Sequence, residues 1–201
     1  MTPGGTRLYQ LPDGLPPLVW RAVELARTLS FEFSCRPEQG RLLQLLARGR
    51  TGGVIGETGT GCGVGLAWML SGAGPGTRFV SVERDQQCAD AVQGMLAGYT
   101  NVNVLCRDWS ALVEHGPFDL LVLDGGGGGK APGHAPVEPN VVLKPFGTLV
   151  VDDFTPITSW PPVHDGQVDA ARLHWLQHPD LLATEVVLSP EMSTIIGVRR
   201  H

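Results

Sequence analysis

Residues 54–65 of the chain read VIGETGTGCGVG, a short apolar run followed by glycine at every second position. The run predicts a strand that ends at Glu57, and the apolar residues Val64–Leu70 predict a helix. Alternate glycines allow the backbone to turn tightly and to approach another group closely. The stretch therefore predicts a strand, a tight loop and a helix, the unit from which α/β sheets are built.

Strands and helices alternate on both sides of this unit. Further strands are predicted at Arg78–Glu83, Val102–Cys106, Phe118–Asp124 and Gly147–Asp152. Helices are predicted at Pro16–Leu29, Pro37–Arg48, Asp85 to about Gly98, Pro136–Leu143 and Gln167–Gln177. Thr184–Leu188 and Ser193–Val198 flank a short turn, as an antiparallel hairpin does. Five strands separated by helices predict right-handed crossovers and a parallel sheet, with the hairpin added at one edge.

The expected fold class is therefore α/β: a Rossmann-like, doubly wound, mostly parallel sheet in a three-layer arrangement. A length of 201 residues suits one domain. We expect residues 1–201 to form it, with a helical N-terminal segment over 1–50 and the α/β core over 51–201.

Composition narrows the class of partner. The net charge is −5 and the arginines are dispersed, which disfavours binding to a nucleic-acid backbone. The four cysteines form no CxxC pair, so we expect reduced thiols in a cytoplasmic protein. No apolar run approaches the length of about 18 residues that a membrane span needs, so we expect no membrane partner.

Two common phosphate-binding patterns do not fit the glycine-rich stretches of the chain. The dinucleotide pattern G-x-G-x-x-G fails in all three registers, because its last position falls on Val64, Leu66 or Trp68. A phosphate-binding loop ending at Lys130 would need glycine at Asp124. The pattern that does fit is acidic-x-Gly-x-Gly-x-Gly from Glu57. A strand–helix turn that only tolerates glycine remains the alternative.

Two later features outline adenosine. Glu83 ends the next strand, where a carboxylate accepts hydrogen bonds from ribose hydroxyls. Asp108 and Trp109 follow the third strand, where a carboxylate could accept from an adenine amino group and an indole could cover the ring.

From about Ser34 to Phe154 the chain resembles the class I S-adenosylmethionine-dependent methyltransferases. Within them it is similar to the catechol-type or caffeoyl-CoA-type O-methyltransferases. The segments that carry the resemblance are Arg36–Gly40 (RPEQG), ETGTGCG at the loop, VSVERD at the second strand, FDLLVLD at the fourth and LVVDD at the fifth.

The resemblance implies a seven-stranded sheet that ends in the hairpin, and a methyltransferase that acts on a hydroxyl of a small molecule, aromatic or phenolic in kind. An S-adenosylmethionine-binding protein without transferase activity is the alternative, and a homodimer is left open. The cofactor residues that it implies are Cys35, Glu57, Gly59, Thr60, Gly61, Gly63, Glu83, Arg84, Asp108, Trp109 and Asp124.

Asp124, Asp152 and Asp153 end neighbouring strands of the predicted sheet. Three converging carboxylates make an oxygen site for Mg²⁺, Mn²⁺ or Ca²⁺. In the catechol-type family the matching positions bind Mg²⁺, which activates the acceptor hydroxyl. In the alternative that stays open, Asp124 contacts the cofactor ammonium and the Asp pair caps the following loop.

The proton acceptor is less well marked. The family places a lysine a few residues after the fourth-strand aspartate, whereas here Gly125–Gly129 occupies that stretch and Lys130 follows it. A flexible glycine loop could bring Lys130 in, but the sequence alone does not assign the base. Asp124, Lys130 and His164 are the candidate catalytic residues.

Overall fold

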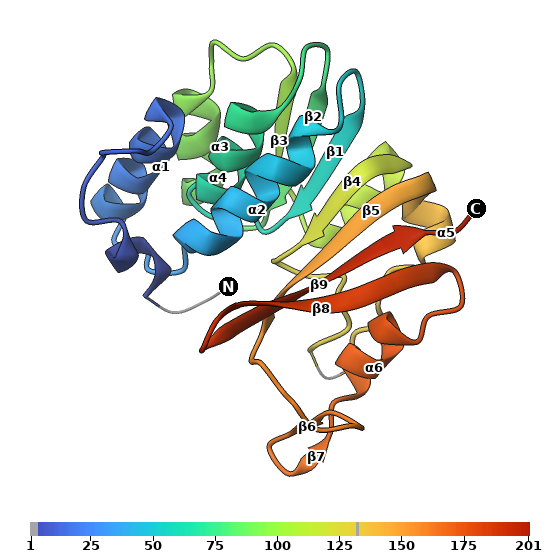
Figure 1. Cartoon of the computed structure of the whole chain (residues 1–201). Coiled ribbons are helices and arrows are strands. Elements are labelled where there is room, and N and C mark those ends of the chain that lie inside the picture. Colours follow the sequence, from blue (N-terminus) through green and yellow to red (C-terminus); the bar gives the residue numbers. More distant parts are fainter. Residues whose placement is uncertain (1–3, 132) are drawn as a thin grey trace.

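The computed structural model describes residues 4–131 and 133–201. Its centre is a seven-stranded sheet, whose strands are labelled in Figure 1. The strand order is β3-β2-β1-β4-β5-β9-β8. Strands β1 to β5 are parallel, and β9 pairs antiparallel with both β5 and β8. The strands are β1 (Val54–Thr58), β2 (Arg78–Glu83), β3 (Val102–Cys106), β4 (Phe118–Leu123), β5 (Leu143–Phe154), β8 (Leu181–Ser189) and β9 (Met192–Arg199). The predicted fold class is confirmed.

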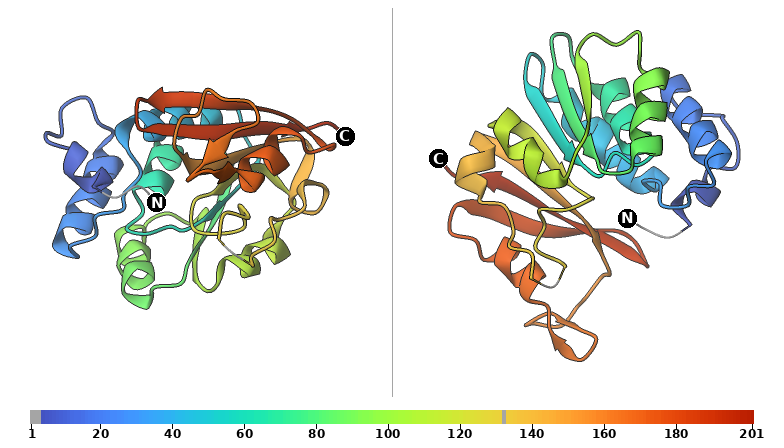
Figure 2. Two further views of the ribbon diagram at one scale, coloured as in Figure 1. Left: turned by 90° about the horizontal axis from the view of Figure 1, so that it is seen from below. Right: turned by 180° about the vertical axis from the view of Figure 1, so that it is seen from behind.

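Helices cover both faces of the sheet (Figure 2). One layer holds α1 (Pro17–Thr28), α2 (Pro37–Arg48), α3 (Val64–Gly72) and α4 (Gln86–Met95). The other holds the 3₁₀ helix η2 (Trp109–His115), α5 (Pro139–Val142) and α6 (Ala170–Leu176). A second 3₁₀ helix, η1 (Gly5–Leu8), precedes α1. Within the described residues, no helix has the length and apolarity needed to cross a bilayer.

Strand β4 shows why the central strands are so apolar. Leu120 and Val122 belong to the core under the first helix layer, whereas Leu121 and Leu123 belong to the core under the second. Since successive side chains point to opposite faces, a strand covered on both sides must be apolar at nearly every position.

Several predicted boundaries differ from the structure, and those of α5 and α6 have a clear physical reason. The helix predicted from Gln167 begins at Ala170, because Gln167–Val168 is strand β7, paired with β6 (Val163–His164) in a small hairpin. Asp169 then caps α6 by accepting a hydrogen bond from the Arg172 backbone N–H. Helix α4 ends at Met95, before Gly98, and α5 is a single turn because β5 already begins at Leu143.

The order of the strands creates the site. From β1 the chain builds outward through β2 and β3, and then returns to place β4 on the other side of β1. Ligands bind in such sheets where the strand order reverses, beyond the carboxyl ends of the strands. Here the loops after β1 and β4 touch: a Cβ built on Gly125 would lie 2.3 Å from Gly59 Cα.

The glycine run Gly125–Gly129 is packed against other parts of the chain. A Cβ on Gly126 would lie 2.4 Å from the Trp109 ring, and one on Gly128 would lie 3.1 Å from Val151. The run is also hydrogen-bonded, since the Thr58 hydroxyl donates to the Gly126 carbonyl and Trp175 Nε1 donates to that of Gly128. Glycine is present because the neighbouring groups leave no room for side chains.

Gly125→Ala should therefore destabilise the fold by about 2–3 kcal/mol, because the new methyl group overlaps the Gly59 backbone. Chemical denaturation measures this change. Gly94→Ala is the control, since no atom lies within 4 Å of a Cβ there and Gly94 is helical. That change should stabilise by about 0.5–1 kcal/mol. Equal stability of Gly125→Ala and the wild type would show that the two loops do not touch.

Candidate functional site

A cavity of about 210 Å³ opens at the carboxyl ends of β1 to β4. Five of the predicted cofactor residues line it: Gly59, Glu83, Arg84, Asp108 and Trp109. Arg107 and His134 also line it, and the sequence did not mark either of them.

The Glu83 carboxylate is buried and already tied to the backbone. It accepts a hydrogen bond from Gly61 N–H at 2.7 Å and one from Asp85 N–H at 2.9 Å. Glu83 therefore holds the glycine loop to the end of β2, in addition to facing the cavity. A carboxylate oxygen has more than one lone pair, so it can accept further hydrogen bonds from a ligand.

Asp108 and Trp109 line the same cavity. The Asp108 carboxylate caps η2 by accepting from the Ser110 N–H and hydroxyl, and these bonds hold its pKa below the usual value. The Trp109 indole lines the cavity and also packs on Gly126 and Gly127. Both residues thus have structural roles beside the predicted one.

A second, smaller hollow adjoins the first, and Gly59 lines both. Its walls contain the predicted Cys35, Glu57, Thr60, Gly61 and Asp124, together with Phe31 and Phe33 from the segment between α1 and α2. Gly63, also predicted, is the N-cap of α3 directly behind this hollow, in a left-handed conformation that favours glycine.

Glu57 is fully buried in a chain of hydrogen bonds. Its carboxylate accepts from the Ser81 hydroxyl at 2.6 Å, and Ser81 lies 2.5 Å from the Thr60 hydroxyl. Burial, helped by the charges of Asp124 and Glu83 and opposed by the hydrogen bond from Ser81, raises the pKa of Glu57 to about 8. A cationic ligand group in this hollow would stabilise the ionised carboxylate.

The three predicted metal ligands do come together. Carboxylate oxygens of Asp124, Asp152 and Asp153 lie within 4.8 Å of one another. Burial and the charge of Asp124 raise the pKa of Asp152 to about 7. Among the described residues, none donates a hydrogen bond to the buried Asp152 Oδ1. The donor set and this buried oxygen fit a divalent cation that prefers oxygen ligands.

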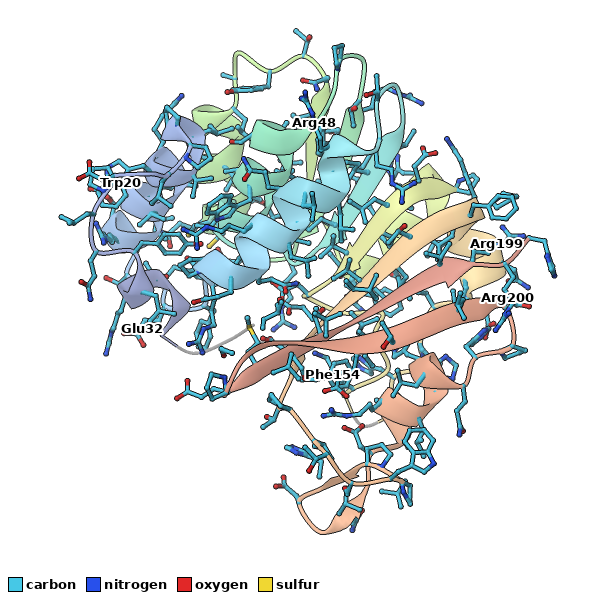
Figure 3. The ribbon with its side chains drawn as sticks, viewed as in Figure 1. Trp20, Glu32, Arg48, Phe154, Arg199 and Arg200 are labelled. Carbon is cyan, nitrogen blue, oxygen red and sulfur yellow. The ribbon has the colours of Figure 1, made fainter. Side chains whose placement is uncertain are left out.

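Lys130 reaches the same place. Its ammonium donates to the backbone carbonyls of Asp152 and Asp153, and it lies 5.0 Å from the centroid of the Phe154 ring, which Figure 3 labels. Burial lowers the pKa of Lys130, whereas the charges of Asp152 and Asp124 raise it. Lys130 comes later in the sequence than the family's lysine, but the packed glycine run still places it beside Asp152 and Asp153.

A cavity of about 350 Å³ lies beside Lys130, and His164 lines it too. The His164 side chain is 56% exposed, so it is the more solvated of the two candidate bases. Arg172 forms a buried wall of this cavity and donates to Asp169, Glu185 and the Thr155 carbonyl. The burial of Arg172 could not be predicted from the sequence, since an arginine in an amphipathic helix normally faces solvent.

Solved structures share this fold. The chain has a TM-score of 0.72 and 22% identity to cofactor-bound Rv0187 from MTB, covering 100% of this chain and 99% of that one. For an O-methyltransferase from Bacillus cereus in complex with SAH the values are 0.69 and 19%, covering 98% and 96%. For the O-methyltransferase TomG from Streptomyces achromogenes, in complex with SAM, they are 0.70 and 19%, covering 98% and 96%. No protein-family model and no curated protein sequence matches the chain. At these identities, the shared property is the fold.

The raised pKa of Glu57 predicts a pH-dependent stability. The folded state keeps the proton up to about pH 8, whereas the unfolded chain loses it near 4.5. Stability should therefore fall between these pH values, by up to about 1.4 kcal/mol per unit from this one group. Glu57→Gln removes this contribution, so its stability relative to the wild type should increase from pH 5 to pH 8. Urea unfolding at several pH values measures it, and a constant difference between the two proteins would contradict the buried, protonated Glu57.

Proposed function

We propose that the chain is an S-adenosylmethionine-dependent methyltransferase that acts on a hydroxyl of a small molecule. The observation that carries the proposal is the meeting of Glu83, the glycine loop, Asp108 and Trp109 at two adjoining hollows. The neighbours bound to SAH and SAM, which have this fold, support it.

The larger hollow suits the adenosine part of the cofactor. Glu83 would accept from the ribose hydroxyls and Asp108 from the adenine amino group, with Trp109 against the ring. Glu57 and the loop from Gly59 to Gly63 would surround the methionine part, where the buried carboxylates favour its cationic ammonium. When bound, the cofactor supplies the methyl group from its sulfonium centre.

We call the smaller hollow, which Glu57 and the glycine loop line, the methionine hollow. Asp124, Asp152 and Asp153 would hold a divalent cation beside it, and Asp124 also lines it. When bound, such an ion lowers the pKa of an acceptor hydroxyl and orients it. The chain's own task at this point is to supply three oxygen ligands.

Lys130 would accept the proton of the acceptor hydroxyl. Burial favours its neutral amine, which is the form that a base needs. The acceptor itself would enter the cavity shared by Lys130 and His164. This delivery of an amine to the carboxylate cluster favours a transferase over a protein that only binds the cofactor.

Cofactor binding tests the proposal first. S-adenosylhomocysteine at about 100 times its Kd should stabilise the fold by about 2.7 kcal/mol, whereas NAD and ATP at the same concentration should not. Glu83→Ala should weaken binding by about 1.5–3 kcal/mol, because a charged hydrogen-bond acceptor is lost. Thermal shift and calorimetry measure both effects.

Asp85→Ala is the matched control for Glu83→Ala. Asp85 caps α4 by accepting from Cys88 N–H and is absent from the cavity walls. Its loss should destabilise the unliganded protein by about 1 kcal/mol and leave affinity unchanged. Stabilisation by NAD with no response to S-adenosylhomocysteine would overturn the proposed cofactor.

Removal of divalent ions tests the acid cluster. With an acceptor identified by formation of S-adenosylhomocysteine, EDTA should stop turnover. Asp152→Asn should raise the Mg²⁺ concentration needed for half-maximal rate, because it weakens a ligand, and should leave cofactor affinity intact. Asp13→Asn, exposed in the loop before α1 and outside the cluster, is the control. Full activity in EDTA would exclude a metal and leave Lys130 or His164 to take the proton unaided.

A further inference from the structure

The outer wall of the methionine hollow is the segment Phe31–Cys35, which joins α1 to α2. The Phe31 ring covers the glycine loop so closely that a Cβ on Gly61 would lie 2.8 Å from it. The segment belongs to no helix or strand. Its position must therefore be set by contacts with other parts of the chain.

Residues at the start of the chain supply many of these contacts. The Thr6 hydroxyl lies 2.7 Å from the Phe31 carbonyl oxygen and 2.7 Å from the Ser34 hydroxyl. Arg7 forms an ion pair with Glu32, which is labelled at the margin of the molecule in Figure 3. The exposed ion pair contributes little, so the buried bonds of Thr6 are the stronger restraint.

Tyr9 connects the wall to the helix behind the glycine loop. Its side chain is 2% exposed, and its hydroxyl donates to the Cys35 carbonyl at 2.7 Å. The same oxygen accepts from Trp68 Nε1, on α3, at 3.0 Å. Trp68 is itself held in place by α2, where a Cβ on Gly40 would lie 2.2 Å from Nε1. One hydroxyl thus joins the wall to the helix that begins at the glycine loop.

We propose that Tyr9 is a positioning residue whose hydroxyl holds Phe31–Cys35 against the glycine loop and thereby sets the affinity for the methionine part of the cofactor. The inference rests on the proposed function. It adds a function for a residue that does not line either hollow. A phenylalanine would fill the same space, so the hydroxyl is the group to test.

Tyr9→Phe should raise the Kd for S-adenosylhomocysteine about 5- to 20-fold, since the wall loses its bond to α3. The KM for S-adenosylmethionine should rise by a similar factor while kcat stays within about twofold, because Tyr9 does not touch the reacting atoms. In the unliganded protein, alkylation of Cys35 by iodoacetamide, followed by peptide mass spectrometry, should accelerate at least about fivefold. Cys106, on β3, is the internal reference and should react at an unchanged rate.

Thr77→Val is the matched control. Thr77 is buried directly before β2, at the amino ends of the strands and therefore away from the site. Its hydroxyl donates to the Arg50 carbonyl. It should lower the melting temperature to a similar extent but leave the Kd and the Cys35 rate unchanged. If Tyr9→Phe does not fold, Thr6→Val removes the neighbouring bond to the wall and should give the same pattern.

An unchanged Kd in Tyr9→Phe would overturn the positioning role, whatever the Cys35 rate. An equal loss of affinity in Tyr9→Phe and Thr77→Val would also overturn it, because the effect would then be general destabilisation. Wild-type protein that does not bind S-adenosylhomocysteine would refute the proposed function itself. In that case the rate of Cys35 alkylation still decides whether Tyr9 holds the segment Phe31–Cys35 in place.

Discussion

The contact between the backbones of Gly59 and Gly125 is the constraint on which the site depends. It joins the loop after β1 to the loop after β4 at the position where the strand order reverses. Neither residue can carry a Cβ, so the two loops approach as closely as backbones can. The cavity of about 210 Å³, the hollow beside Glu57 and the start of the glycine run all adjoin this contact. The rest of the site is arranged around it.

A second constraint is electrostatic. Five acidic residues gather at the carboxyl ends of the strands, and most of them are buried: Glu57, Glu83, Asp124, Asp152 and Asp153. Burial and mutual repulsion raise the pKa of Glu57 and Asp152, so this end of the sheet is unfavourable without positive charge. The proposed ligands, a cationic cofactor and a divalent ion, are species that would supply positive charge there.

The fold could be predicted from the sequence because local patterns determine it. Apolar runs and glycines in the sequence predicted where β1 to β5 lie. The bounds of β2, β3 and α2 are those predicted. Most of the candidate cofactor and metal residues could be selected because they follow strand ends, whose positions in a parallel sheet are known in advance. What could not be predicted depends on contacts between distant segments. The packing of Gly125–Gly129 on Trp109 and Val151, the buried Arg172 and the bond from Tyr9 to Cys35 have no local signature.

The contact of Gly59 with Gly125 also bears on how the protein acquires its site during synthesis. The contact requires β4 to insert beside β1, so it can form only after the intervening strands β2 and β3 have been synthesised. Such pairing closes a long loop and is slow compared with helix formation. A nascent chain that ends before β4 has the glycine loop but not the surface that faces it. Ligand binding should then begin only after β4 and β5 have left the ribosome, as a late and cooperative event.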